Sequence, residues 1–524
     1  MAIVFVLVAT LVLAVLVTAN WYVWRRLFRD TTRGPGLTRR LGAVLVAGGW
    51  TLAITALVAE RSGAPFWLQQ VLAWPGFLWL ALSIYLFLGV LAGEVVRPLL
   101  RWFLERRAKT RASERSLPGE PDKRSLPGEP DTGTRPADTP GTAPPGTAPA
   151  APAAVGAADG LMDAGAPGEA AVPAAAGSQV GAGASGVGAG VGASGAGACA
   201  ETGAGGSGAA VASATVSPPQ PEPVPAAPQG SAEPLATPAP SPSPASGPSH
   251  PSRRLFVSRV VAGAAAAAAV GTVGYGTYGV LRGPKVKRVT VPLAKLPRAA
   301  HGYRIAVVSD VHLGPVLGRG FAQKVVDTIN ATQPDLIAVV GDLVDGSVRD
   351  LGPAAAPLAQ LKARHGSYFV TGNHEYFSGA GQWVEEVRRL GLTPLENARR
   401  EMPYFDLAGV NDVAGEDEGQ GPDFARALGD RDTARACVLL AHQPVQIHDA
   451  VEHGVDLQLS GHTHGGQLWP GNLLAAAANP TVAGLERYGD TQLYVSRGAG
   501  AWGPPTRVGA PSDVTLIELA SKQA

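Results

Sequence analysis

The chain has 524 residues and a formal net charge of +1, so it lacks the strongly basic balance expected of a nucleic-acid-binding protein. Its two cysteines, Cys199 and Cys437, lie far apart in very different sequence surroundings, which excludes a disulfide framework and a cysteine zinc knuckle. Hydrophobic residues make up 46% of the chain but are unevenly distributed, which indicates separate membrane, linker and globular segments.

Three apolar runs near the start predict three transmembrane helices. They cover Ala2 to Ala19, about Leu41 to Ala59 and about Phe66 to Val96. Arginine-rich segments at 25–40 and 97–111 follow the first and third runs, and the positive-inside rule places both in the cytoplasm. A cleaved signal peptide is the alternative for the first run, but its basic residues follow the apolar stretch instead of preceding it.

Residues 109–251 are rich in Ala, Gly, Pro and Ser, a composition that predicts a disordered linker acting as a tether. A fourth apolar segment follows at about Val260 to Leu281. It is preceded by Ser252-Arg253-Arg254-Leu255-Phe256-Val257, which resembles a twin-arginine export motif and would make the twin-arginine translocation machinery a partner. The alternative is a plain anchor with cytoplasmic arginines, and both interpretations place the following domain outside the cytoplasm.

The final part of the chain, residues 286–524, has the alternation of strand and helix patterns that predicts a layered α/β domain. The predicted organisation is therefore three transmembrane helices in 1–108, the linker in 109–251, the twin-arginine-like motif and fourth segment in 252–285, and the catalytic domain. Strands are expected at 303–309, 335–340, 367–371, 404–410, 436–441, 456–460, 494–496 and 514–519. Helices are expected at 321–332, 354–364 and 381–390.

Five short polar motifs occur in order along this domain, each where a predicted strand ends. They are Asp310-Val311-His312, Gly341-Asp342, Gly372-Asn373-His374-Glu375, Ala441-His442-Gln443 and Gly461-His462-Thr463-His464. Taken singly, such motifs are common in surface turns. All five at strand ends indicate one site, because open α/β sheets bind ligands at the carboxyl ends of their strands.

The residue types in these motifs are suited to two divalent metal ions. Carboxylates and neutral imidazoles suit Mn, Fe and Zn, and the two oxygens of Asp342 could bridge two ions. Two ions about 3.5–4 Å apart would activate a hydroxide and neutralise the phosphoryl oxygens of an ester. Glycines at 341, 372 and 461 permit the tight backbone that brings such ligands together.

The motifs resemble the calcineurin-like metallophosphoesterase superfamily over about Val289 to Leu519, with the pattern D-x-H, G-D, G-N-H-[DE], H and G-H-x-H. The longer segments that contain these motifs, such as His442-Gln443-Pro444, are similar to those of the membrane-associated bacterial YkuE/YaeI-type phosphoesterases. The resemblance implies a sandwich of two packed sheets flanked by helices. It also implies two metal sites that share one carboxylate, the first held by Asp310, His312, Asp342 and His464, the second by Asp342, Asn373, His442 and His462.

The same resemblance implies that His374 is not a ligand but hydrogen-bonds a phosphate oxygen or protonates the leaving group. Glu375 would support the ligands from behind, or it is an ordinary loop carboxylate. UDP-diacylglucosamine hydrolases of the lipid A pathway carry Arg after the Gly-Asn pair, so His374 argues against that substrate.

Arg497 could contact a phosphate or form a structural ion pair. Trp469 and Trp502 are expected in the core, with pocket lining or lipid contact as alternatives. The remaining histidines considered, expected at the surface or behind the ligands, are His301, His365, His448 and His453.

The sequence therefore predicts a multi-pass protein of the cell membrane with an extracytoplasmic, metal-dependent phosphoric ester hydrolase domain. A phosphodiester is favoured by the resemblance, and the membrane setting favours an envelope or lipid-linked phosphate ester. One alternative is a non-enzymatic metal-binding sensor or scaffold. Another is a channel or transporter. Charged residues within the membrane mark ion and substrate pathways, but Glu94, near the end of a span, is the only acidic candidate in the three N-terminal spans.

Overall fold

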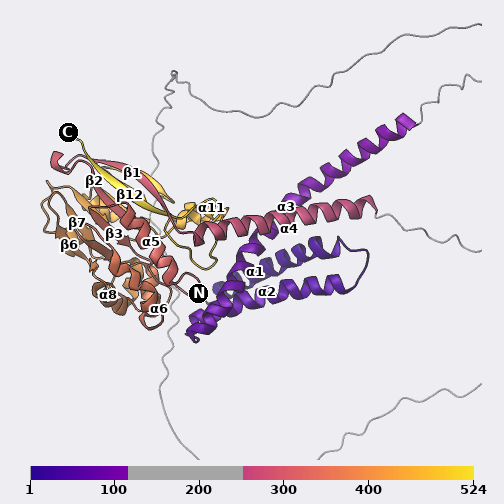
Figure 1. Cartoon of the computed structure of the whole chain (residues 1–524), viewed down its shortest axis with the longest axis horizontal. Coiled ribbons are helices and arrows are strands. Elements are labelled where there is room, and N and C mark those ends of the chain that lie inside the picture. Colours follow the sequence, from indigo (N-terminus) through magenta and orange to yellow (C-terminus); the bar gives the residue numbers. More distant parts are fainter. Residues whose placement is uncertain (1, 116–251, 524) are drawn as a thin grey trace, which may run out of the picture. The chain divides into compact units, whose positions relative to one another are not determined.

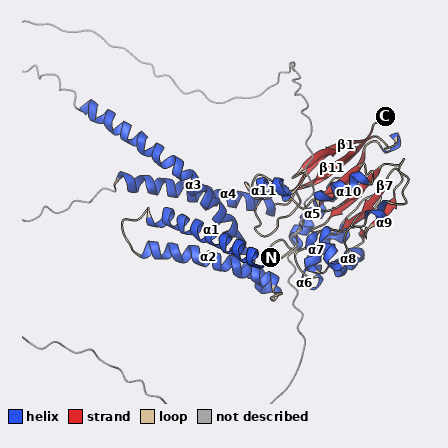
Figure 2. Cartoon of the chain, turned by 180° about the vertical axis from the view of Figure 1, so that it is seen from behind, coloured by secondary structure: helices blue, strands red, loops and turns tan. Residues whose placement is uncertain are grey.

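Two six-stranded sheets form the centre of the last domain in the computed structural model, which describes residues 2–115 and 252–523 (Figure 1). Both sheets contain parallel and antiparallel strands, and helices lie on their outer faces (Figure 2). The predicted α/β class of two packed sheets flanked by helices is confirmed. The predicted linker lies outside the described residues from residue 116 to residue 251.

The first sheet has the order β1-β12-β2-β3-β4-β5. Its strands β2 to β5 run parallel to one another, whereas β12 pairs antiparallel with β2 and parallel with β1. The strands are β1 (Lys285–Leu293), β2 (Tyr303–Val308), β3 (Leu336–Val340), β4 (Ser367–Val370), β5 (Thr393–Pro394) and β12 (Asp513–Ser521).

The second sheet has the order β10-β11-β9-β8-β7-β6. Its four central strands are parallel, and an antiparallel strand closes each edge. The strands are β6 (Ala398–Glu401), β7 (Asp406–Gly409), β8 (Cys437–Leu440), β9 (Leu457–Ser460), β10 (Gly484–Tyr488) and β11 (Thr491–Val495).

Alternating apolar side chains explain why the sheets pack face to face. In β2, Ile305 and Val307 belong to the core between the sheets, whereas Ala306 and Val308 belong to the core beneath the helices of the first sheet. In β8, Val438 faces the inter-sheet core in the same way. Successive side chains of a strand point to opposite faces, so strands buried on both sides read as continuous apolar runs.

Helices cover both outer faces. Over the first sheet, α5 (Arg319–Ala331), α6 (Val348–Ala355) and α8 (Ala380–Arg389) supply buried residues to one core. Over the second sheet, α9 (Phe424–Leu428) and α10 (Ile447–Glu452) supply another. The remaining short helices of the domain are α7 (Asn373–Ser378) and α11 (Gly471–Ala478).

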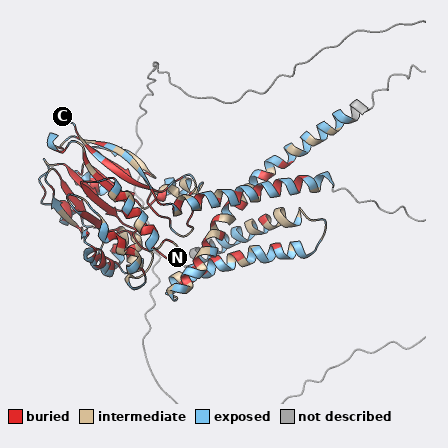
Figure 3. Cartoon of the chain, viewed as in Figure 1, coloured by how far each residue is buried: buried red, intermediate tan, exposed pale blue. Residues whose placement is uncertain are grey.

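Four helices in the described residues are long and apolar enough to cross a membrane. They are α1 (Ala2–Trp24, continuing as a π-helical turn through Arg29), α2 (Leu37–Arg61), α3 (Phe66–Arg115) and α4 (Arg253–Leu281). Many apolar side chains on α1 and α2 are exposed, as Figure 3 shows in pale blue, which is expected where lipid replaces water.

Several elements differ from the predicted ones. β1 was not predicted, because lysine and arginine interrupt its apolar residues; it forms an edge strand that needs burial on only one face. β10 and β6 were also missed and are likewise charged edge strands.

The helix expected at 354–364 begins earlier and gives way to a 3-10 turn, in a segment that contains Pro353 and Pro357. α2 extends through Glu60, so Glu94 is not the only acidic residue in the N-terminal helices.

Candidate metal centre

The five motifs converge at one edge of the two sheets. β2, β3 and β4 are parallel neighbours in the first sheet, and β8 and β9 are parallel neighbours in the second. The residues just after these strands therefore meet where the carboxyl ends of both sheets come together. The structure brings together all seven side chains predicted as ligands, which are Asp310, His312, Asp342, Asn373, His442, His462 and His464.

One buried group consists of Asp310, His312, Asp342 and His464, whose potential ligand atoms all lie within 4.8 Å of one another. The Nε2 atom of His464 lies 3.3 Å from an Asp310 carboxylate oxygen and 3.0 Å from the Nε2 atom of His312. These four residues are the set predicted for the first metal ion.

A second group consists of Asp342, His442 and His462, again with ligand atoms within 4.8 Å. Asn373 joins it, because its side-chain oxygen lies 3.0 Å from the Nδ1 atom of His462. The Asp342 oxygen Oδ2 lies 3.1 Å from His442 Nε2 and 3.8 Å from His312 Nε2. Asp342 therefore stands between the two groups, where a bridging ligand would have to be.

The backbone around these residues is strained. Non-glycine residues rarely adopt a positive φ, and a cluster of them marks a site where the fold enforces an unusual geometry. Gly341 shares this conformation with φ of 72°. A Cβ atom on Gly461 would collide with Asp310, so this glycine allows the two loops to approach closely. The potential ligands with positive φ are Asp310, His312, Asp342, His462 and His464.

The state of His442 fits a metal ligand. Its Nδ1 atom lies 2.9 Å from the carbonyl oxygen of Val340, so this nitrogen carries the proton and donates it. The other ring nitrogen, Nε2, is fully buried and lies 3.1 Å from the Oδ2 atom of Asp342, so in the neutral imidazole its lone pair is directed to the same place as the Asp342 carboxylate. Backbone hydrogen bonds of this kind fix the tautomer of ligating histidines.

The charges in the site also fit cations. Burial lowers the pKa of His462 to about 4 with help from the charge of His442, and burial lowers the pKa of His464, so both offer neutral imidazoles. Burial also opposes charge on His442, but the adjacent carboxylate of Asp342 outweighs it and raises the pKa of His442. Buried carboxylates thus draw positive charge to this point, which metal ions can supply.

Asp345 is a site residue that the sequence analysis missed. One of its oxygens lies 2.9 Å from His312 Nδ1 and 2.7 Å from His374 Nδ1, so it orients a potential ligand and the potential proton donor together. Burial alone would raise the pKa of Asp345, but the two histidines lower it to about 2. Burial opposes charge on His374, but Asp345 outweighs it and raises the pKa of His374 to about 9. The only hint in the sequence was a second aspartate three residues after Asp342.

Glu375 supports the loops from behind, so it is not an ordinary loop carboxylate. It is fully buried and accepts hydrogen bonds from the backbone N–H groups of Gly372, Asp342 and Leu343, at 2.6, 3.0 and 2.7 Å. These bonds tie the loop after β4 to the loop after β3. Arg507, also unpredicted, donates to the carbonyl oxygen of His464 at 2.9 Å and thereby holds the last ligand loop.

The two tryptophans are exposed, so the expectation of core packing was wrong. Trp469 is 53% exposed, and its carbonyl oxygen accepts a hydrogen bond from Tyr85 of α3. Trp502 is 49% exposed and lies beside His374, with ring centroids 5.6 Å apart. Phe377 flanks His374 with ring centroids 5.8 Å apart. Loops made of glycine and proline leave these rings without a core to enter.

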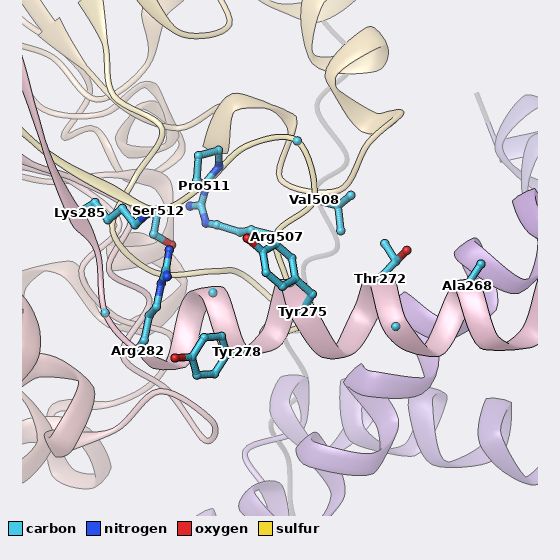
Figure 4. Close-up of a pocket in the computed structure, with 15 residues that line it drawn as sticks. Ala268, Thr272, Tyr275, Tyr278, Arg282, Lys285, Arg507, Val508, Pro511 and Ser512 are labelled. Atoms are coloured by element: carbon cyan, nitrogen blue, oxygen red, sulfur yellow. The ribbon is translucent and has the colours of Figure 1, made fainter. Parts of the chain in front are cut away.

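Two cavities can be compared with the site. One of about 330 Å³ is lined by His374 and Asp345 and adjoins the potential ligands. A larger one of about 730 Å³ runs along α4 past Tyr275 and Arg282 to Arg507 (Figure 4). None of the seven potential ligands lines either cavity. The smaller one is the candidate for substrate binding, because Asp345 and His374, which both contact the potential ligand His312, line it. Besides His374, the histidines that belong to neither ligand group in the described residues are His301, His365, His448 and His453.

Comparison with known proteins agrees with this geometry. Residues 303–466 match a family model described as calcineurin-like phosphoesterase. A protein of Aquifex aeolicus named uncharacterized metallophosphoesterase is 34% identical over 243 residues, which cover 45% of this chain and 92% of that protein. The chain belongs to the calcineurin-like phosphoesterase family.

Other relatives share the phosphoesterase domain within chains of different length. A Danio rerio protein named transmembrane protein with metallophosphoesterase domain is 39% identical over 264 residues, covering 48% of this chain and 60% of that protein. The Bacillus subtilis protein named uncharacterized metallophosphoesterase YkuE is 29% identical over 280 residues, covering 52% of this chain and 98% of that protein. The matched part thus spans less than two thirds of the Danio rerio relative.

Proposed function

We propose that the chain is a membrane-anchored phosphohydrolase that uses two divalent metal ions and acts outside the cytoplasm on an envelope or lipid-linked phosphodiester. The observation that carries this proposal is the position of Asp342 between two buried groups of potential ligands, beside a cavity lined by His374. A metal-binding domain without catalysis would not need His374 in that cavity.

Each part of the site has a role under this proposal. Asp310, His312, Asp342 and His464 would hold one ion, and Asp342, Asn373, His442 and His462 the other. Bound ions, with Mn, Fe or Zn suited to these ligands, neutralise phosphoryl oxygens and lower the pKa of water for attack on phosphorus.

His374 provides the proton donor. Its Nδ1 atom is held by Asp345 at 2.7 Å, so its other ring nitrogen is the one available to a phosphate or leaving-group oxygen. An imidazole positioned in this way can give up a proton as the ester bond breaks. The proposed preference of the enzyme for a phosphodiester over a phosphomonoester rests on the resemblance to the YkuE/YaeI type.

The chemical proposal is tested with the full-length protein in detergent, loaded with Mn²⁺. We expect turnover of bis-p-nitrophenyl phosphate with a higher kcat/KM than for p-nitrophenyl phosphate. Chelation should abolish turnover and re-addition of Mn²⁺ should restore it, because the side chains of the site cannot replace the ions in activating water and neutralising the phosphate. Stoichiometric metal binding with turnover of neither ester would instead support the metal-binding sensor or scaffold.

The placement outside the cytoplasm is supported by where the arginines of the helices gather. Arg26 of the turn after α1 pairs with Glu94 of α3 at 2.7 Å, and Arg259 of α4 donates to the carbonyl oxygen of Thr31 at 2.9 Å. The opposite ends of α3 and α4 contribute Phe66 and Val280 to the packing of the phosphoesterase domain. The domain therefore lies at the ends away from this group of arginines. Arg61 and Arg282 stand at the domain end, but this end is less basic, and the positive-inside rule assigns it to the extracytoplasmic side.

This topology predicts the accessibility of an introduced thiol. In a Cys199→Ser background, Glu418→Cys on an exposed turn of the domain should react with a membrane-impermeant maleimide in intact cells. Ser252→Cys at the start of α4 should react only after permeabilisation, and buried Cys437 serves as the unreactive background. Labelling of Ser252→Cys, and not Glu418→Cys, in intact cells would place the domain in the cytoplasm.

A further inference from the structure

The cavity beside His374 is not formed by the phosphoesterase domain alone. One wall carries Asp345, His374, Phe377 and Trp502 from that domain, and the rest of the chain contributes the ends of α2 and α3. The residues from these two helices are Leu57, Glu60, Arg61 and Leu80. All the described residues belong to one compact unit, so the wall is part of the same body as the candidate metal centre.

Specific contacts hold the helix ends against the domain. The guanidinium of Arg61 lies over the ring of Phe377, 5.8 Å from its centroid. Val316 of the domain packs with Ala56 of α2 and Phe77 of α3. The hydroxyl of Tyr85 donates to the carbonyl oxygen of Trp469 at 3.0 Å. These contacts hold α2 and α3 against the domain, and the contact of Arg61 with Phe377 joins two residues that line the cavity.

The chemistry of the cavity changes from polar to apolar across its width. His374 and Asp345 form the end nearest the potential ligands, whereas Leu57 and Leu80 belong to helices whose other side chains suit the interior of a bilayer. Phe377 is 71% exposed and Trp502 is 49% exposed, so two aromatic rings beside His374 offer apolar surface that the protein itself does not cover.

The end of α2 adds a cation to the cavity. Arg61 lines it and can attract a phosphate. Glu60, the preceding residue, lines the same cavity as Asp345 and His374, so the end of α2 lies close to the reacting end.

We propose that the ends of α2 and α3 complete the catalytic pocket and that the substrate is an amphiphilic phosphodiester whose apolar chain lies against Leu57 and Leu80. This inference rests on the proposed phosphoesterase function. It gives the N-terminal helices a part in substrate selection in addition to anchoring. A lipid held in this way reaches the metal centre without leaving the membrane surface, since its chain stays beside apolar helices while its phosphate approaches His374.

The test compares two substrates that differ only in the apolar chain. Ethyl p-nitrophenyl phosphate and hexadecyl p-nitrophenyl phosphate have the same leaving group, and both are assayed with the full-length protein in the same mixed micelles. We expect wild type to prefer the hexadecyl ester by about tenfold or more in kcat/KM, because only its chain can bury methylene groups against the pocket wall.

Variants of the wall's apolar residues should reduce this ratio. Leu57→Ala and Trp502→Ala remove apolar contacts, and each should lower the hexadecyl-to-ethyl ratio several-fold. Arg61→Ala removes a cation that attracts the phosphate of both esters, so it should lower kcat/KM for both and leave their ratio unchanged. Ile54→Ala is the matched control, since Ile54 is an exposed apolar residue of the same helix that does not line the cavity and should keep the wild-type ratio.

The possible failures are distinct. Turnover of the ethyl ester with no chain preference, or a ratio that survives both Leu57→Ala and Trp502→Ala, contradicts the pocket assignment and leaves the phosphoesterase function standing. Turnover of neither ester contradicts the proposed function. In that case direct binding decides the pocket: ethyl hexadecyl phosphate, a diester, bound by wild type and released more readily by Leu57→Ala supports it, and equal affinities overturn it.

Discussion

Replacing Asp342 by asparagine is expected to reduce kcat/KM for bis-p-nitrophenyl phosphate by at least about a thousandfold. One oxygen of Asp342 lies 3.1 Å from His442 and 3.8 Å from His312, so the change removes negative charge from both potential metal sites at once. Metal ions contribute several kcal/mol to stabilising the charge that develops in such reactions, and each factor of ten corresponds to about 1.4 kcal/mol.

Metal content separates this effect from general damage to the fold. The purified Asp342→Asn protein should bind fewer Mn²⁺ ions than wild type. It should retain a cooperative thermal transition, because asparagine has the same shape and the site lies at the sheet edge and not in the inter-sheet core. Asp417→Asn, in an exposed turn of the same domain, is the control and should behave like wild type in both measurements. Full activity with a normal metal content in Asp342→Asn would remove Asp342 from the bridging position.

Replacing His374 by glutamine is expected to reduce turnover by about 10²- to 10⁴-fold while metal content stays at the wild-type level. His374 belongs to neither of the two groups that contain Asp342, and its Nδ1 atom is engaged by Asp345. A proton donor matters most when the leaving group is basic. The loss should therefore be larger for methyl phenyl phosphate than for methyl p-nitrophenyl phosphate.

The dependence on the leaving group distinguishes the two roles considered for His374. Equal losses for both esters would mean that it binds a phosphate oxygen and does not protonate the leaving group. Asp345→Asn should reproduce part of the leaving-group effect, since Asp345 orients His374, and should also weaken metal binding through His312. His448→Gln, an exposed histidine outside the site, is the matched control.

Local sequence patterns predicted the strands that carry the ligands because these strands are buried on both faces. Their apolar runs are continuous, and polar residues begin where each run ends, as at Val308 before Asp310 and at Val340 before Asp342. The edge strands β1, β6 and β10 lacked this pattern, because an edge strand has one face or one side open to solvent and tolerates charged residues.

The supporting residues could not be predicted in the same way. Asp345 serves two histidines from different loops, and Glu375 accepts three backbone N–H groups from two loops. Arg507 reaches His464 across more than forty positions of the chain. Carboxylates and guanidiniums at such places look like ordinary loop residues in a sequence, because only the fold brings their partners within hydrogen-bond distance.

The sequence by itself determined the chemistry: the order of five polar motifs at strand ends, the residues able to bind metal, and four apolar segments long enough to form transmembrane helices. These depend on residue type and local spacing. Only the tertiary structure decided that Asp345 links His312 with His374, and that Arg61 and Leu57 of α2 line the cavity beside His374. Those relations join residues distant in the chain, and the packing of sheets and helices alone brings them together.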